Sequence, residues 1–228
     1  MKLAEQKWSY GLLAISFVLV TASLLMIFIV VPTEATMGVI QRIFYYHVPV
    51  AWVAFLAFFV VFVASIMYLW KRDRKWDTIA ASSAELGVIF TTLVLITGSI
   101  WAKPIWGIWW TWDARLTTSL VLWLIYVAYL LVRSYIAEEE RAARFAAVVG
   151  IVGFIDVPIV ALAIVLWGTQ HPSPIIFSGG LQPTMLATLL VSLSAITSVY
   201  SLLLLQRINI RKDEIEVKNL RQLNEEKY

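Results

Sequence analysis

The chain has 228 residues, of which 61% are hydrophobic and 14% are charged, and its formal net charge is +3. Soluble domains carry about 25% charged residues, so this composition excludes an ordinary soluble domain and indicates a membrane protein. The absence of cysteine excludes a CxxC redox pair, a thiolate metal site and a CxxCH site for covalent haem attachment.

Six apolar stretches of roughly 16 to 24 residues match the length of about 20 residues that a helix needs to cross the bilayer core. In chain order, the predicted spans are Tyr10–Val31, Val48–Trp70, Ala84–Ile100, Thr117–Val132, Phe145–Trp167 and Thr184–Leu205. The fourth is the shortest, and its helix is expected to extend into the flanking residues. The first follows Lys2 and Lys7 and lacks a small-residue cleavage site, so we interpret it as a retained helix rather than a signal peptide.

A polar tail, residues 206–228, follows the last span and is expected to form a short surface helix. The sequence therefore predicts an all-α membrane protein with a six-helix membrane domain over residues 1–205, which includes a Trp-rich segment at 101–116, and a cytoplasmic tail.

Lysine and arginine are distributed unevenly between the two ends of the spans. The N-terminus, the loops after spans two and four and the tail hold 15 of the 18 basic residues, and the other three are Arg42, Lys103 and Arg115. The positive-inside rule then predicts that both termini are cytoplasmic. Residues 32–46, 101–116 and 168–183 are expected on the outer, periplasmic or extracytoplasmic, face of the plasma (inner) membrane. Both histidines belong to this face, because His47 opens span two and His171 follows span five.

The Trp-rich segment reads WAKPIWGIWWTWD from Trp101 to Asp113 and holds five of the eleven tryptophans. If the part after Pro104 is helical, Trp106, Trp109, Trp110 and Asp113 share one face about 100° wide, and Trp112 and Arg115 point elsewhere. An aromatic belt at the membrane surface is one interpretation. A platform for a large, flat, apolar ligand is the other interpretation. It is favoured by Asp113 and Arg115, because an aromatic belt does not need charged residues at fixed spacings from its tryptophans.

The two histidines suggest what that ligand is. A single histidine near a membrane surface is commonly structural or solvated. Two imidazoles make a poor zinc site, which usually has three or four protein ligands. They make a good axial pair for a haem iron, whose other four ligands come from the porphyrin. The negatively charged haem propionates would pair with cations. The basic residues expected on the outer face are Arg42, Lys103 and Arg115.

Three stretches resemble one family of membrane proteins. The run WGIWWTWDARLT (residues 106–117) is similar to the WWD signature of haem-handling proteins in cytochrome c maturation. The runs YYHVPVAW (residues 45–52) and DVPIV…WGTQHPSP (residues 156–174) resemble the histidine regions of the haem exporter protein C family, also called cytochrome c maturation protein C. The chain departs from the family pattern at Gly168, where many members have tryptophan, and at Asp156, where an amide is common.

The resemblance implies a haem-binding and transfer protein that is not an enzyme. Haem b would be held non-covalently at the outer face, with His47 and His171 as axial iron ligands. The implied contacts around it are Trp106, Trp109, Trp110, Trp112, Asp113 and Arg115. The implied partners are a haem chaperone (cytochrome c maturation protein E), ABC transporter subunits, a small single-span protein and membrane lipid, but no nucleic acid.

Two other functions stay open. The related cytochrome c synthetase family shares the Trp motif and attaches haem to apocytochrome, but its members are usually longer and carry more outward histidines. A proton-coupled transporter of a small solute would use Asp156, an acid inside span five that costs about 2.5–3.5 kcal/mol on insertion scales. Pro158 frees the carbonyl of Phe154, and a protonated Asp156 could donate a hydrogen bond to such a group.

Overall fold

The computed structural model describes residues 2–171 and 179–225 of the chain. Its helices are α1 (Lys2–Leu25), α2 (Phe44–Lys71), α3 (Arg74–Trp106), α4 (Ala114–Tyr135), α5 (Glu139–Gly153), α6 (Asp156–Trp167) and α7 (Pro183–Glu225). A π-helical turn (Met26–Val30) extends α1, and a short 3-10 helix (Val39–Ile43) precedes α2. Within the described residues, six helical segments are long and apolar enough to cross a membrane, which confirms the predicted all-α fold with six spans.

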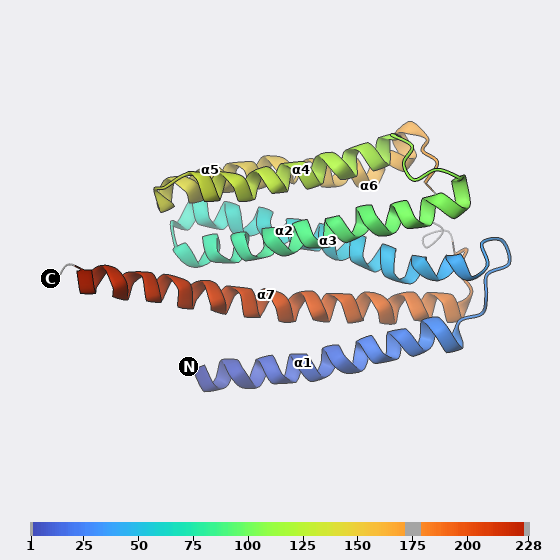
Figure 1. Cartoon of the computed structure of the whole chain (residues 1–228), viewed down its shortest axis with the longest axis horizontal. Coiled ribbons are helices and arrows are strands. Elements are labelled where there is room, and N and C mark those ends of the chain that lie inside the picture. The colour runs from blue at the N-terminus through green and yellow to red at the C-terminus, as the bar shows by residue number, and fades with distance from the viewer. Residues whose placement is uncertain (1, 172–178, 226–228) are drawn as a thin grey trace.

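The two termini lie at one end of the bundle and three connections lie at the other (Figure 1). The α1–α2, α3–α4 and α6–α7 connections share the end opposite both termini, as six consecutive crossings require. His47, the Trp-rich segment and His171 therefore belong to a single end of the molecule. The side of the membrane that this end faces stays a prediction from the distribution of lysine and arginine.

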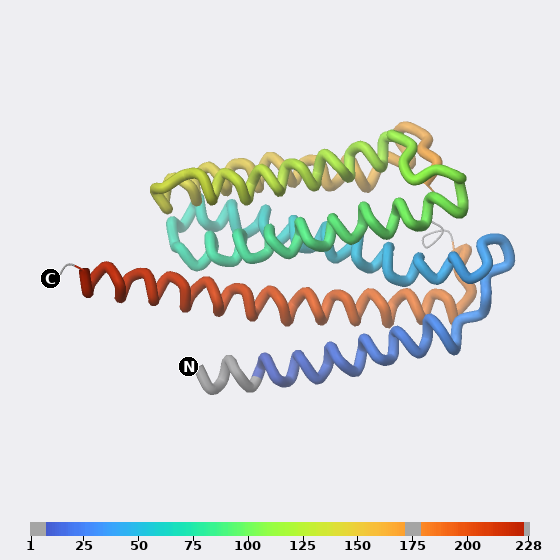
Figure 2. The backbone as a smooth tube through the Cα atoms, viewed as in Figure 1, coloured from blue at the N-terminus to red at the C-terminus, as the bar shows by residue number. Residues whose placement is uncertain are grey.

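Helices α2 and α3 form the centre of the bundle. They pack on each other, on α7 at one side, and on α4 and α5 at the other. Helix α1 packs in turn on α7 (Figure 2). Small side chains allow the close approach, since a run of five on α3 is buried: Ala80, Ala81, Ser82, Ser83 and Ala84. Gly150 of α5 has the same role, because a Cβ there would lie 3.0 Å from Ser65 Oγ and from Val61 Cγ1.

Two helices are longer than their apolar spans predicted. Helix α3 begins at Arg74, after Asp73 accepts a hydrogen bond of 3.0 Å from the Lys75 backbone N–H. Residues 74–83, which were expected in a loop, are thus helical. The polar tail is not a separate short helix, because α7 runs unbroken from Pro183 to Glu225 and extends past the other helices at the end that carries the termini (Figure 2). Helix α4, in contrast, gains residues at both flanks as predicted.

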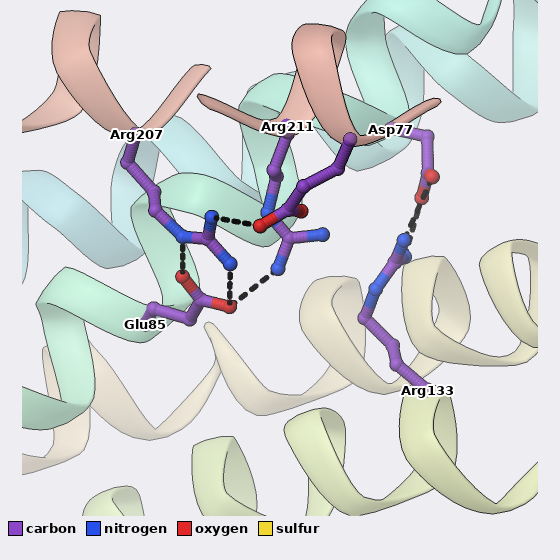
Figure 3. Close-up of polar contacts among 6 residues, drawn as sticks. Asp77, Glu85, Arg133, Arg207 and Arg211 are labelled. Carbon is purple, nitrogen blue, oxygen red and sulfur yellow. Dashed lines mark hydrogen bonds and ion pairs between the residues drawn. The ribbon is translucent and has the colours of Figure 1, made fainter. Parts of the chain in front are cut away.

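Ion pairs join α3 to α4 and to α7 (Figure 3). Glu85 of α3 accepts from Arg207 Nε at 2.5 Å and also pairs with Arg211, both on α7. Arg133 of α4 donates two bonds, of 2.5 and 2.8 Å, to the carboxylate of Asp77 on α3. Such two-pronged bonds between charged groups are stronger than neutral ones. The pairs of Arg207 and Arg211 with Glu85 hold this polar part of α7 against α3.

The fifth span is interrupted at its middle. Helix α5 ends at Gly153 and α6 begins at Asp156, next to Pro158, which has no N–H to donate. The Phe154 carbonyl accepts from the Val157 N–H at 3.1 Å. The predicted hydrogen bond from Asp156 to that carbonyl is absent, and Asp156 Oδ2 is buried without a hydrogen-bond partner in the described part of the chain.

Candidate ligand-binding site

A pocket lies where α2, α3, α4 and α6 meet the connections at the loop end of the bundle. It encloses about 910 Å³, a volume that includes the open space at its mouth. Five of the eight residues that the sequence singled out line it: His47, Trp106, Trp110, Arg115 and His171. Residues that are far apart along the chain thus meet in one pocket.

The pocket wall is mainly apolar. Phe55 of α2, Val94 and Ile105 of α3 and Leu122 of α4 supply large apolar groups. Two other lining residues are tryptophans whose indole Nε1 is buried without an acceptor among the described residues; they are Trp101 and Trp110. Buried donors are normally satisfied, so a ligand that brings acceptor groups would suit this wall.

His47 is held firmly at the start of α2. Its side chain is buried, and its Nδ1 lies 2.9 Å from Thr97 Oγ1 of α3. The edge of the Trp101 ring faces it, with centroids 5.8 Å apart at 69°. Gly98 lies directly beside the ring, since a Cβ there would be 3.1 Å from His47 Cε1. Three neighbouring residues of one face of α3 therefore surround this imidazole.

His171 reaches the same pocket from the segment after α6. Helix α6 ends at Trp167, and Gly168 adopts a left-handed conformation with φ of 59° that ends it. The Pro172 and Pro174 of the motif around this histidine lie outside the described residues. His171 itself is described and lines the pocket.

The tryptophan segment is not helical beyond Trp106, so the predicted shared helical face is wrong. Gly107 ends α3 in the left-handed region at φ of 77°, and its N–H donates to the Lys103 carbonyl at 3.0 Å. The Lys103 ammonium donates in turn to the Gly107 carbonyl at 2.7 Å. Glycine is the usual residue just after a helix, because it has no Cβ penalty there. Residues 107–113 then run as an irregular segment up to α4.

Asp113 starts α4 rather than closing a row of tryptophans. As the N-cap it accepts from the Leu116 N–H at 3.0 Å, and its other carboxylate oxygen accepts from Thr111 Oγ1 at 2.9 Å. It is not among the residues that line the pocket, within the described part of the chain. Its predicted contact with a ligand stays a prediction.

The tryptophans divide into two groups. Trp106 and Trp110 line the pocket, whereas Trp109 and Trp112 are 56% and 70% exposed. Trp112 has a φ of 55°, which is uncommon outside glycine, and its ring meets the Trp110 ring edge-on at 5.7 Å. Lys103 lies over the Trp109 ring at 6.0 Å. The segment therefore presents aromatic surface both to the pocket and away from it.

Arg115 is the one of the three predicted outward cations that lines the pocket, within the described residues. It lies in the first turn of α4, and its Nη1 donates to the Val160 carbonyl of α6 at 3.0 Å. Arg42 instead lies over the Phe28 ring at 5.8 Å. An anionic group in the pocket would thus meet the Arg115 guanidinium.

The sequence reasoning missed Thr97, Gly98 and Trp101. A signal was present, because Thr97, Gly98 and Ser99 form a run of small and polar residues inside an otherwise apolar span. Small residues in a membrane helix commonly mark close packing against another helix. That signal does not, however, identify His47 as the group packed there.

Comparison with known proteins gives consistent matches. The family described as Heme exporter protein C matches residues 1–224. The Heme exporter protein C of Bradyrhizobium diazoefficiens is 37% identical over 172 residues, which cover 74% of this chain and 65% of that protein. The Escherichia coli (strain K12) protein of the same name is 32% identical over 202 residues, or 88% and 82%. That of Rhodobacter capsulatus is 34% identical over 140 residues, or 61% and 58%. The matched part is less than two thirds of the Bradyrhizobium and Rhodobacter proteins.

Proposed function

The chain belongs to the heme exporter protein C family, and from this premise we propose that it binds haem b non-covalently between His47 and His171 and delivers it to a haem chaperone. Membership of the family supports a role in haem handling for cytochrome c maturation, as a membrane component of an ABC-type export system and not as an enzyme. It favours this function over a synthetase-like attachment of haem and over a solute transporter that uses Asp156.

The observation that carries the proposal is the meeting of both histidines of the chain at one apolar pocket. The haem iron takes four ligands from the porphyrin and two axial ones, which the two imidazoles would supply. The apolar wall and the rings of Trp106 and Trp110 suit the flat body of the porphyrin. Arg115 would meet a propionate, since guanidinium and carboxylate groups form strong charge-assisted hydrogen bonds.

A titration of the purified protein with haem tests this function. In detergent, we expect one equivalent of haem to give the absorption spectrum of a six-coordinate, low-spin haem with two histidine ligands. Acidified organic solvent should then extract all of the haem as free haem b, because no covalent bond holds it. A protein that leaves the absorption spectrum of free haem in detergent unchanged would overturn the proposal.

The exposed tryptophans are proposed to serve the delivery step. Trp109 and Trp112 lie beside the pocket and are exposed, and tryptophan is enriched where binding energy concentrates at protein interfaces. The prediction from lysine and arginine places them on the outer face, where the haem chaperone would dock. The ABC transporter subunits and the small single-span protein are the other proposed partners.

Substitution of tryptophans separates haem binding from delivery. In the double variant Trp109→Leu and Trp112→Leu we expect haem affinity within twofold of the wild type. Transfer to the chaperone should be slowed by about 30-fold, since truncation of a hot-spot residue of an interface costs about 2 kcal/mol or more. Trp110→Leu is the matched control at the pocket wall and should weaken haem binding about tenfold. Haem titration and stopped-flow transfer measure the two steps. Equal loss of haem affinity in both variants would contradict the division.

A further inference from the structure

The hydrogen bond between His47 and Thr97 fixes the position of a proton on the imidazole. His47 Nδ1 lies 2.9 Å from Thr97 Oγ1. A neutral imidazole has one nitrogen that donates and one that accepts, so either group could be the donor in this pair. The other contacts of the threonine hydroxyl decide which one it is.

The Thr97 hydroxyl donates elsewhere. Its Oγ1 lies 2.6 Å from the Leu93 carbonyl oxygen and 3.4 Å from the Val94 carbonyl oxygen. Both are acceptors only, so the single hydroxyl hydrogen is directed to this part of the α3 backbone. Thr97 Oγ1 must then accept from His47, which places the imidazole proton on Nδ1. Nε2 becomes the ring nitrogen with the lone pair.

The same face of α3 fixes the ring itself. At 100° per residue, positions 97, 98 and 101 lie within one face of the helix. Gly98 allows the ring to approach, because any side chain would bring a Cβ to 3.1 Å from Cε1. The edge of the Trp101 ring also faces the imidazole, and the two ring centroids are 5.8 Å apart. The imidazole is therefore held in both orientation and tautomer before any ligand arrives.

We propose that Thr97 is a positioning residue that presents Nε2 of His47 to the haem iron; this rests on the proposed haem-binding function. Histidines that bind metals usually donate their other ring N–H to an oxygen, which fixes the tautomer and makes the binding nitrogen more basic. A more basic ligand stabilises the ferric state. Loss of such a partner typically weakens metal binding by about 10–100-fold.

The simpler alternative is that Thr97 only satisfies a buried histidine. In that case its removal would lower the stability of the fold but would leave the electronic properties of bound haem unchanged. The reduction potential of the haem distinguishes the two roles, because it responds to the basicity of the axial ligand and not to the stability of the bundle.

The test compares three threonine variants in the full chain, with haem as the probe. Thr97→Val keeps the shape and removes the acceptor, and Thr97→Ser restores it. Thr188→Val is the matched control, since Thr188 is also buried in a helix and donates to the carbonyl four residues before it at 2.7 Å, but contacts no histidine in the described structure. Equilibrium titration gives haem affinity, and a redox titration gives the potential.

We expect Thr97→Val to bind haem about 10–100-fold more weakly and to shift the reduction potential to a more positive value. Thr97→Ser should lie within threefold of the wild type, and Thr188→Val should match it. The inference is overturned if Thr97→Val keeps the affinity and potential of the wild type, or if Thr188→Val moves the potential equally. A wild-type protein that binds no haem would instead overturn the proposed function.

A second measurement needs no folded Thr97 variant. In the His171→Ala protein, His47 is the only histidine, and ¹⁵N NMR of its ring without haem reports which nitrogen carries the proton. We expect the Nδ1–H tautomer. The Nε2–H tautomer would overturn the inference whatever the behaviour of haem.

Discussion

Haem added to His47→Ala or His171→Ala is expected to lose its two-histidine spectrum in both variants. Each substitution removes one proposed axial ligand, and the chain contains only two histidines to supply them. Loss of an outer hydrogen-bond partner alone costs about 10–100-fold in metal affinity, so loss of the ligand itself should cost about 100-fold or more. Absorption spectra should change from a low-spin, six-coordinate form to a high-spin, five-coordinate form, and titration gives the affinity.

Added imidazole should rescue a variant that lacks only the ring of His47. In His47→Gly, Thr97 and Trp101 still surround the space that the ring leaves, so added imidazole should enter it and restore the low-spin spectrum. The absorption spectrum of the double variant His47→Ala with His171→Ala should show no histidine bound to the haem iron. If either single variant kept a two-histidine spectrum, the assignment of the axial ligands would be wrong, since no third histidine exists. Thermal melts in detergent show that each variant is folded.

Replacement of Arg115 is expected to weaken haem binding strongly. If its guanidinium pairs with a propionate in the apolar pocket, Arg115→Met leaves a buried carboxylate unpaired. Truncation of one member of such a pair costs about 2 kcal/mol or more, which is a loss of about 30-fold in haem affinity. Lys103→Met is the matched control, because Lys103 is a cation at the same end of the bundle that caps α3 and is absent from the pocket lining among the described residues.

The dimethyl ester of haem separates the charge from the structural role of Arg115. Arg115 also joins α4 to the Val160 carbonyl of α6, so its loss could loosen the pocket. If the pairing is with a propionate, Arg115→Met should bind the ester as well as the wild type does, because the ester carries no negative charge to pair. An equal loss for haem and for its ester would show that the arginine acts only through the fold.

The arrangement of the candidate site residues at one end of the molecule could be predicted from sequence. The length of each apolar stretch identifies the spans, because the backbone N–H and C=O groups of a span must form their hydrogen bonds within its own helix inside the bilayer. Six spans in succession then bring the first, third and fifth connections to one end, which is where Figure 1 shows them. His47, His171 and the Trp-rich segment were assigned to this end without any knowledge of helix packing.

The form of the Trp-rich segment was mispredicted although its signals were present. Gly107 and Asp113 are typical residues for the end of one helix and the start of the next, and both act so here. The expected face of tryptophans rested instead on the assumption that the helix continues after Pro104. Local capping decided the outcome, since a helix that ends at Trp106 satisfies its terminal groups through Gly107 and Lys103.

The choice of which side chains share the pocket came only from tertiary structure. Apolar patterning and the basic residues fix how many helices there are, roughly where they end and which ends lie together. They do not fix how far each helix is rotated about its own axis, because a membrane span is apolar on nearly every side. Packing of small residues between α2 and α3 sets that rotation. It brings Thr97 to His47, 50 residues away in the chain, and places Trp110 in the pocket while Trp112 faces outward.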